Sequence, residues 1–229
     1  MKSLVLLGKV LFWVVLSLLS QNVEAQSREY IRKAIRSWGE CRNVAITKSN
    51  GDLALYGRNG WARTGCPQSL NEALDELNEE KTYIDDVQLT EEGRWLILVD
   101  DNGFRWNDIP IDLERKLRYY NNEGEVVTSV TFNDAGNWIV ITTEHISASN
   151  SEVQKWLMEG IDEFGKLWAA CVTDDAIVAV FARGYKFVGN VPESLKTALK
   201  QTTLNVYRLK VAGTSWFFAD KDGSYQYSM

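Results

Sequence analysis

Histidine and cysteine are scarce in this chain, which has one His and three Cys. A single histidine, His145, excludes a His-rich metal site, and no Cys/His spacing suits zinc. We therefore expect neither a metal nor a cofactor. The odd number of cysteines leaves at least one thiol unpaired. A bridge between Cys41 and Cys66 stays open, although parallel neighbouring helices would hold these two residues at opposite rims.

The sequence also lacks the common catalytic signatures: it has no Gly-rich phosphate loop, no Ser-centred elbow and no metal motif. Three carboxylate pairs are the only candidates for acid–base chemistry: Asp85-Asp86, Asp100-Asp101 and Asp174-Asp175. We expect these acids in turns that flank strands, where Asp forms local hydrogen bonds. Adjacent residues of a strand also point to opposite faces. The pattern thus favours a protein that is not an enzyme.

Basic residues are outnumbered by acidic ones, 25 to 31, which gives a formal net charge of −6. An acidic chain is a poor partner for nucleic acid or for an anionic membrane surface. Proline is rare as well, with three residues, and no Ser- or Gly-rich stretch marks a linker. We therefore predict one domain over residues 26–229.

Residues 1–25 have the pattern of a secretory signal peptide. Lys2 and Lys9 precede an apolar core over residues 10–19, and Val23-Glu24-Ala25 is typical of a cleavage site. The apolar core is too short for a comfortable membrane span. We expect a secreted or periplasmic protein without a membrane span after cleavage.

A repeated unit organises the rest of the chain, and residues 93–124 show it best. Trp95–Val99 is a short apolar run typical of a buried strand, and the Asn-Gly turn after it leads to a second strand with alternating residues. Pro110 then opens a helix. Proline recurs 43 residues before and 82 residues after Pro110, at Pro67 and Pro192, which are spacings of about one and two units.

Five helical faces repeat at positions i, i+3, i+4 and i+7. They begin at Ile31, Leu70, Leu113, Val153 and Leu195. Five middle strands repeat in step with these helices. They begin at Leu53, Trp95, Trp138, Ile177 and Trp216. With the strands before and after each middle strand, the sequence predicts five strand-strand-strand-helix units of an α+β repeat protein.

The phase of the repeat favours closure. The helix over residues 27–38 lacks preceding strands, and the last strands lack a following helix. An open stack would need polar terminal caps, whereas Trp216–Phe218 form an apolar strand near the end of the last unit. We therefore predict a five-bladed, β-propeller-like ring whose N-terminal helix completes the last unit.

The G-x-W, N-G and P-x-x-L pattern over residues 27–229 resembles that of secreted bacterial tandem-repeat proteins with a β-propeller-like fold. Many members of that group have no assigned activity. The resemblance implies a fold but no functional residue.

Aromatic residues are plentiful, with nine Trp and nine Tyr. We expect Trp95, Trp138 and Trp216 to fill the space between neighbouring units. The third strands add aromatic and arginine side chains that either pack on the helices or bind a ligand. The candidate ligand-binding residues are Trp61, Arg63, Arg105, Trp106 and Tyr185.

The favoured interpretation is a secreted, non-enzymatic binding or scaffold module that contacts a protein or glycan through one face of the ring. The alternative is a small carbohydrate-active hydrolase that uses carboxylates at the ring mouth, since glycoside hydrolysis needs two carboxyl groups in one pocket.

Overall fold

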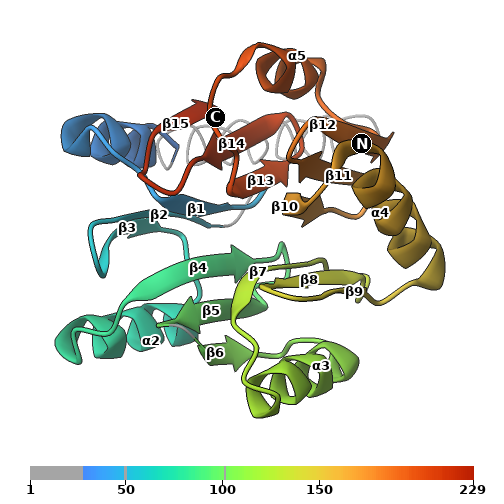
Figure 1. Ribbon diagram of the computed structural model, residues 1–229. Helices are drawn as coiled ribbons and strands as arrows, with labels where there is room; N and C mark the ends of the chain where they lie inside the picture. The colour runs from blue at the N-terminus through green and yellow to red at the C-terminus, as the bar shows by residue number, and fades with distance from the viewer. Residues whose placement is uncertain (1–27, 49–50, 101) are drawn as a thin grey trace, which may run out of the picture.

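The computed structural model describes residues 28–48, 51–100 and 102–229, and the predicted signal peptide lies outside these ranges. Five antiparallel three-stranded sheets follow one another along the chain (Figure 1). They comprise β1 (Asn43–Ile46), β2 (Asp52–Tyr56) and β3 (Gly60–Thr64); β4 (Ile84–Leu89), β5 (Trp95–Val99) and β6 (Gly103–Asn107); β7 (Val127–Phe132), β8 (Trp138–Thr142) and β9 (Ile146–Ala148); β10 (Leu167–Val172), β11 (Ala176–Phe181) and β12 (Gly184–Gly189); β13 (Arg208–Ala212), β14 (Ser215–Ala219) and β15 (Tyr225–Ser228). These sheets and five helices fit a propeller-like repeat fold.

The helices lie on the periphery of the molecule (Figure 1). They are a helix over residues 28–38, α2 (Gln68–Glu79), α3 (Ile111–Asn122), α4 (Ser151–Phe164) and α5 (Glu193–Gln201). Proline precedes α2, α3 and α5, as the sequence predicts, whereas the Asn150 side chain caps α4 by accepting from two backbone N–H groups. Each helix buries one apolar face, and the face of α2 packs on both β2 and β5. A helix therefore fills the wedge between two successive sheets.

The three equivalent tryptophans fill these wedges, which confirms the expectation from the repeat. Trp95, Trp138 and Trp216 are only 4%, 5% and 6% exposed. Each indole Nε1 donates to a residue in the first turn of the neighbouring helix. The acceptors are Ser69 at 3.0 Å, Asp112 at 2.9 Å and Ser194 at 2.9 Å. A buried indole N–H needs a hydrogen-bond partner. The same hydrogen bond therefore holds the helix against the sheet in three wedges.

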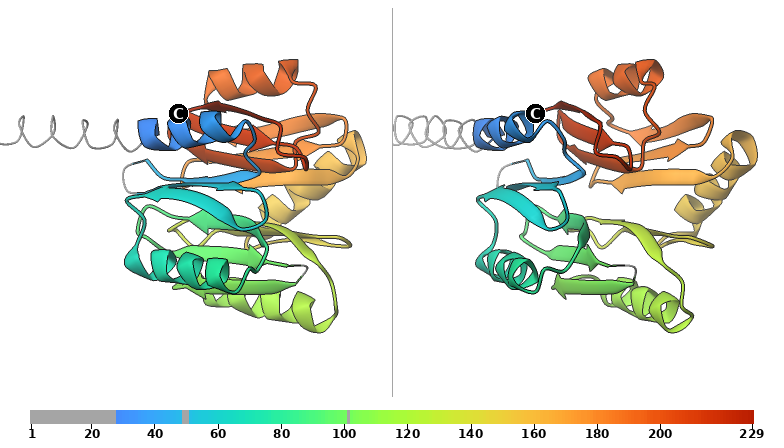
Figure 2. Two further views of the ribbon diagram at one scale, coloured as in Figure 1. Left: turned by 90° about the vertical axis from the view of Figure 1, so that its left-hand side faces the viewer. Right: turned by 60° about the vertical axis from the view of Figure 1, so that its left-hand side comes forward.

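The first strand of each sheet faces the centre of the molecule (Figure 1). These inner strands contact one another in chain order, β1 with β4, β4 with β7, β7 with β10 and β10 with β13, and β13 also contacts β1. The helix over residues 28–38 lies beside the C terminus (Figure 2). Its Ile31 and Ile35 share a core with Phe217 of β14, and Arg32 Nη1 donates to the Met229 carbonyl at 2.7 Å.

All three cysteines lie in the described part of the chain, and each is a free thiol. Cys41 and Cys171 are buried, and Cys66 is half-buried. Burial raises the pKa of Cys41 to about 12 and that of Cys66 to about 11. Thiols that stay protonated in this way are poor nucleophiles. Among the described helices, none is long and apolar enough to cross a membrane.

Candidate functional site

Two cavities lie at the two ends of the five inner strands. We call the opening at the beginnings of these strands the start mouth, and the opening beyond their ends the end mouth. The start mouth has a cavity of about 340 Å³, whereas the cavity of the end mouth is about 50 Å³. Ligand pockets usually measure roughly 300–1,000 Å³. Of these two cavities, as the described residues line them, the one at the start mouth falls in that range.

A repeated β-bulge shapes the start mouth. The pairing register shifts between Ile84 and Asp86, and the same shift recurs in β7 and β10. A bulge places two residues of one strand opposite one residue of its neighbour and turns the extra side chain. The extra residues of the three bulges are Asp85, Thr128 and Trp168, and all three line the cavity.

The other two sheets supply equivalent residues. The backbone N–H of Arg42 donates to Leu55, the same residue that pairs with Asn43. In the last sheet the N–H of Tyr207 likewise donates to Ala219. Each of the five units therefore offers one side chain to the cavity. These mouth residues are Arg42, Asp85, Thr128, Trp168 and Tyr207.

Stacked aromatic rings form one wall of the start mouth. The rings of Trp168 and Tyr207 are nearly parallel, at 9°, with centroids 5.5 Å apart. Lys221 Nζ lies 4.4 Å from the centroid of the Tyr207 ring. Both aromatic side chains remain half-buried, so part of their surface faces the cavity. Such a wall offers apolar area together with a positive charge.

Arginine and tyrosine form a second part of the wall. The Arg42 guanidinium lies 4.6 Å from the centroid of the Tyr83 ring, and its Nη1 is 3.0 Å from the Tyr83 hydroxyl. Arg42 Nη2 also donates to the carbonyl of Ile84 at 2.8 Å. These contacts join the first sheet to the second and hold the guanidinium in one orientation at the mouth.

Two ion pairs close the cavity from below and connect strands that are not neighbours. Arg208 Nη2 of β13 lies 2.7 Å from Asp85, and its Nη1 donates to the Thr128 carbonyl at 2.8 Å. One layer deeper, Lys210 Nζ lies 2.7 Å from Asp86 and 3.0 Å from the Gln88 amide oxygen. Three sheets are thereby joined across the centre.

The expectation that Asp85 and Asp86 lie in a turn and point to opposite faces is wrong. Both residues lie within β4. The bulge removes the strict alternation of the strand, so both carboxylates reach β13. Arg208 and Lys210, two residues apart on that strand, share a face and meet them there.

The two carboxyl groups have different environments. Burial raises the pKa of Asp85 above its ordinary value, and the Arg208 guanidinium offsets this effect only in part. Burial also opposes ionisation of Asp86, but Lys210 and Arg208 outweigh it and hold the pKa of Asp86 below its ordinary value. Asp86 is therefore a charged partner whose loss would leave Lys210 buried and unpaired.

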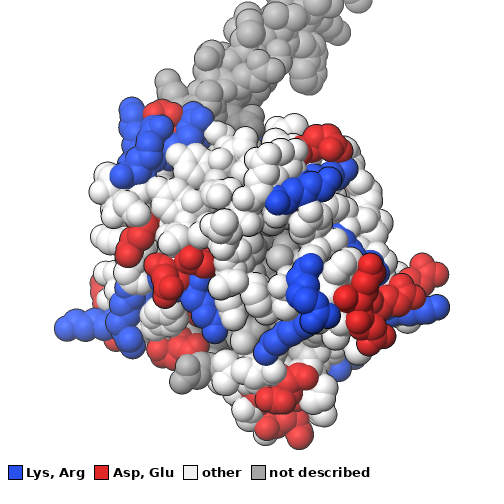
Figure 3. Space-filling model, turned by 45° about the horizontal axis from the view of Figure 1, so that its top comes forward, with Lys and Arg blue, Asp and Glu red and all other residues white. Residues whose placement is uncertain are grey.

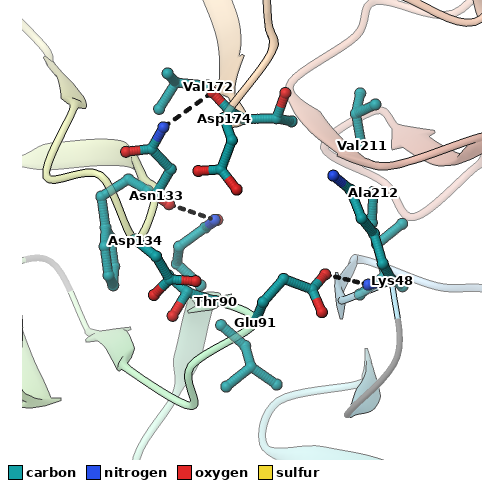
Figure 4. A pocket seen from close by; sticks show the side chains of 14 residues that line it. Lys48, Thr90, Glu91, Asn133, Asp134, Val172, Asp174, Val211 and Ala212 are labelled. Atoms are coloured by element: carbon teal, nitrogen blue, oxygen red, sulfur yellow. Dashed lines mark hydrogen bonds between the residues drawn. The ribbon is translucent and has the colours of Figure 1, made fainter.

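The end mouth carries more acid and less room. Figure 4 shows Lys48, Glu91, Asp134 and Asp174 around it, each following a different inner strand. A Glu91 carboxylate oxygen accepts from the Lys48 backbone N–H, and Asp134 accepts from the N–H of Glu92 at 3.1 Å. In the described part of the chain, no group of His, Cys, Asp and Glu side chains could hold a metal ion.

The residues beneath those acids are committed to tight turns. Thr47 Oγ1 accepts from the N–H of Gly51 at 2.7 Å, and Thr90 Oγ1 accepts from that of Arg94 at 3.2 Å. Asn133 and Thr173 make the same kind of bond in the next two units. Side chains that stabilise turns in this way are less available to a ligand.

The residues predicted from the sequence as ligand-binding lie on the outer strands of three sheets. Trp61 and Arg63 are on β3, where Arg63 lies 3.9 Å from the Trp61 ring centroid and 2.8 Å from Asp75 of α2. Trp61 packs against the core of the wedge between the first two sheets. These contacts are those of the helix-packing alternative.

The other predicted residues behave similarly. Trp106 of β6 packs on Phe104 and lies 5.0 Å below the Arg118 guanidinium of α3, whereas Arg105 is exposed. Tyr185 of β12 contacts Phe187 and the core around α5. The five residues thus form three separate sites on the periphery, and a binding role for them stays a prediction.

Sequence reasoning missed the start mouth, including Arg42, Trp168, Tyr207 and Arg208. The signal was present in the repeat: each mouth residue stands at the beginning of the inner strand of its unit. Arg42 and Tyr207 come just before that strand, and the other three are its second residue. An alignment of the five units on their inner strands would have placed these side chains at one common position. On the face seen in Figure 3, charged groups of each sign are separated by uncharged surface, with no sign dominant.

Comparisons with known proteins add little to this geometry. No family model matches the chain, and no curated protein sequence matches it. Among solved structures, "YCF48 bound to D1 peptide" aligns with 8% sequence identity and a TM-score of 0.31. The alignment covers 81% of this chain and 49% of that one, so this chain spans about half the length of that structure.

Proposed function

We propose that the protein is a secreted, non-enzymatic binding module that contacts a protein or glycan through the face bearing the start mouth. The observation that carries this proposal is the cavity of about 340 Å³ whose walls combine stacked aromatic rings with basic side chains. The bound group would be negatively charged. Four basic residues line the cavity, Arg42, Lys166, Arg208 and Lys221, against the two acids Asp85 and Asp220.

The ionic contacts of these residues favour the same ligand. Arg208 is neutralised by Asp85, so the cavity floor is close to neutral. Lys166 and Lys221 are exposed at the rim, where they can meet a carboxylate without a large desolvation cost. The Trp168–Tyr207 wall would then receive the apolar part of the same group.

A closed ring is part of this proposal, because the mouth needs all five units around one centre. Contact of β13 with β1, and the core that the helix over residues 28–38 shares with β14, support closure. Closure would also cover the apolar faces that the first and last sheets turn toward each other. Export rests on residues 1–25, and N-terminal sequencing of the mature protein should begin at Gln26.

The hydrolase alternative has weaker support. Glycoside hydrolysis needs one carboxyl group that donates a proton and another that is free to act as base or nucleophile. In the start mouth, Asp85 is occupied by Arg208. At the end mouth, the cavity of about 50 Å³ cannot admit a sugar ring.

Calorimetric titration with two probes tests the proposal: a hexuronic acid oligosaccharide and a polyglutamate peptide. One of them should bind, and Lys221→Gln should weaken binding about fivefold, as expected for loss of an exposed charge contact of 1 kcal/mol or less. Lys33→Gln, on the exposed side of the helix over residues 28–38, is the matched control and should leave affinity unchanged. Absence of binding by both probes, or equal effects of the two substitutions, would contradict the proposal.

A further inference from the structure

A further hollow lies between the third and fourth sheets and borders the end mouth, with which it shares Val172, Thr173 and Asp174. It has a volume of about 240 Å³. Its walls come from β8, from the first turn of α4, and from β11 and β12. The apolar residues in these walls are Trp138, Val153, Ile177 and Val188. Val188, next to the last residue of the outer strand β12, is 45% exposed.

The strand register explains why this wedge is hollow. Trp95, Trp138 and Trp216 each pair with a residue at or next to the end of the inner strand: Leu89, Phe132 and Val211. In the fourth sheet, the residue that pairs with Val172 at the end of β10 is Ile177. An isoleucine therefore stands where three other units have a tryptophan.

The neighbouring helix shows the consequence. The residue three positions after the cap is fully buried in α2, α3 and α5, as Leu70, Leu113 and Leu195. Its counterpart in α4, Val153, is only half-buried. Isoleucine is smaller than tryptophan. Apolar surface that an indole covers in the other three wedges therefore stays uncovered in this one.

The helix still provides a place for an indole N–H. In the three filled wedges, the acceptor stands two residues after the cap, as Ser69, Asp112 and Ser194. The residue at this position of α4 is Glu152, which is exposed. A carboxylate can accept from an indole N–H, as Asp112 does from Trp138 at 2.9 Å.

The rim of the hollow is acidic. Asp174 and Asp175 line it and are exposed, and Glu152 stands on the first turn of α4 beside it. Charge complementarity therefore favours a partner with basic residues next to its apolar group.

We propose that this hollow is a docking site for the tryptophan side chain of a partner protein, presented by a basic segment. The indole would take the place that Trp95, Trp138 and Trp216 occupy in their own wedges. Flanking lysine or arginine residues would meet Asp174 and Asp175. Tryptophan in a desolvated pocket is a common source of binding energy at interfaces, and a charged rim adds specificity and a faster association.

The probe is an acetylated and amidated peptide, Gly-Lys-Trp-Lys-Gly, titrated into the full chain by calorimetry. Peptides with Leu or Ala in place of Trp separate the indole from general hydrophobicity and from charge. We expect the Trp peptide to bind at least tenfold more tightly than the Ala peptide, with the Leu peptide between them. Equal affinity of the Trp and Ala peptides would overturn the proposal, because charge alone would then explain binding.

Ile177→Trp fills the hollow from within the chain and is the decisive variant. It should reduce affinity for the Trp peptide at least tenfold while circular dichroism and the melting temperature show a folded protein. Val188→Lys is a second variant, at an exposed position that should not disturb folding. It should weaken binding as well, because it removes apolar wall and repels the lysines of the peptide. Lys33→Gln is again the control and should bind as the wild type does.

Two further results would contradict the proposal. A folded Ile177→Trp protein that binds the peptide normally would place the binding site elsewhere. Self-association of the wild type that disappears in Ile177→Trp, measured by sedimentation, would make a second copy of this chain the occupant in place of a basic partner.

Discussion

The start mouth and the end mouth are built from the same five inner strands, yet their side chains have different tasks. Beyond the strand ends, Thr47, Thr90, Asn133 and Thr173 bond to the tight turn that leads into the next strand. At the strand beginnings, bulges in three of the sheets turn an additional side chain into the opening. The comparison indicates that side chains at one end of the inner strands stabilise turns, while those at the other end face a cavity.

The buried pair below the start mouth gives the largest expected effect. Lys210→Met should lower the free energy of unfolding by about 3–5 kcal/mol, because it leaves the Asp86 carboxylate buried without its partner. The double variant Lys210→Met/Asp86→Leu should recover much of that loss. Urea unfolding followed by circular dichroism measures both. A loss below about 1 kcal/mol for the single variant would mean that the centre is hydrated and not sealed.

Acid should act on the same pair. The pKa of Asp86 is held below its ordinary value, so its contribution to stability is present above the pKa of an unfolded Asp and is lost as the pH falls through the lower folded value. The contribution of Asp85 to stability changes with pH in the opposite direction, because the pKa of Asp85 is raised in the fold. We expect the wild type to lose more stability than Asp86→Asn between pH 5 and pH 3, in thermal melts. Equal losses would assign acid sensitivity to other groups.

Trp168→Ala sharpens the comparison at the level of binding. Removing one half-buried ring of the stacked pair should weaken binding of the acidic probe about tenfold, which corresponds to 1.4 kcal/mol, with a small change in melting temperature. The matched control is Trp106→Ala on an outer strand, where the ring packs near α3. Trp106→Ala should cost stability and leave affinity unchanged. The opposite result would return the candidate site to the outer strands.

Asp174→Asn at the end mouth should have the smallest effect. The residue is exposed and lies on the rim of a cavity of about 50 Å³. Surface substitutions usually change stability by less than about 0.5 kcal/mol, and binding of the acidic probe at the start mouth should not change. A gain in affinity above threefold would show that charge at the end mouth affects binding of the acidic probe at the start mouth.

The sequence predicted the parts of the fold that depend on local periodicity. Leu70, Leu74 and Leu77 form a buried helical face at the predicted spacing, and Trp95 and Trp138 occupy equivalent places because each follows the same glycine turn. These signals lie within a few residues of one another, so one sequence is enough to recognise them.

The start mouth depends on pairing across the molecule, and that is why it was missed. Arg208 and Lys210 lie more than 120 positions after Asp85 and Asp86, and no local pattern links them. The bulge in β4 also breaks the two-residue period from which side-chain direction was inferred. The vacancy at Ile177, in contrast, could have been found by aligning the five units.

The repeated bulge has a consequence for how such a chain can change over time. The three bulged residues project from an already interrupted ladder, and Arg42 and Tyr207 stand just before the strands of theirs, so the pairing within each sheet does not depend on the identity of these side chains. Arg42, Asp85, Thr128, Trp168 and Tyr207 are accordingly five different residue types at one structural position. Duplicated units that began alike could diverge there one by one, and the opening could acquire a new chemical character while the scaffold that surrounds it stays the same.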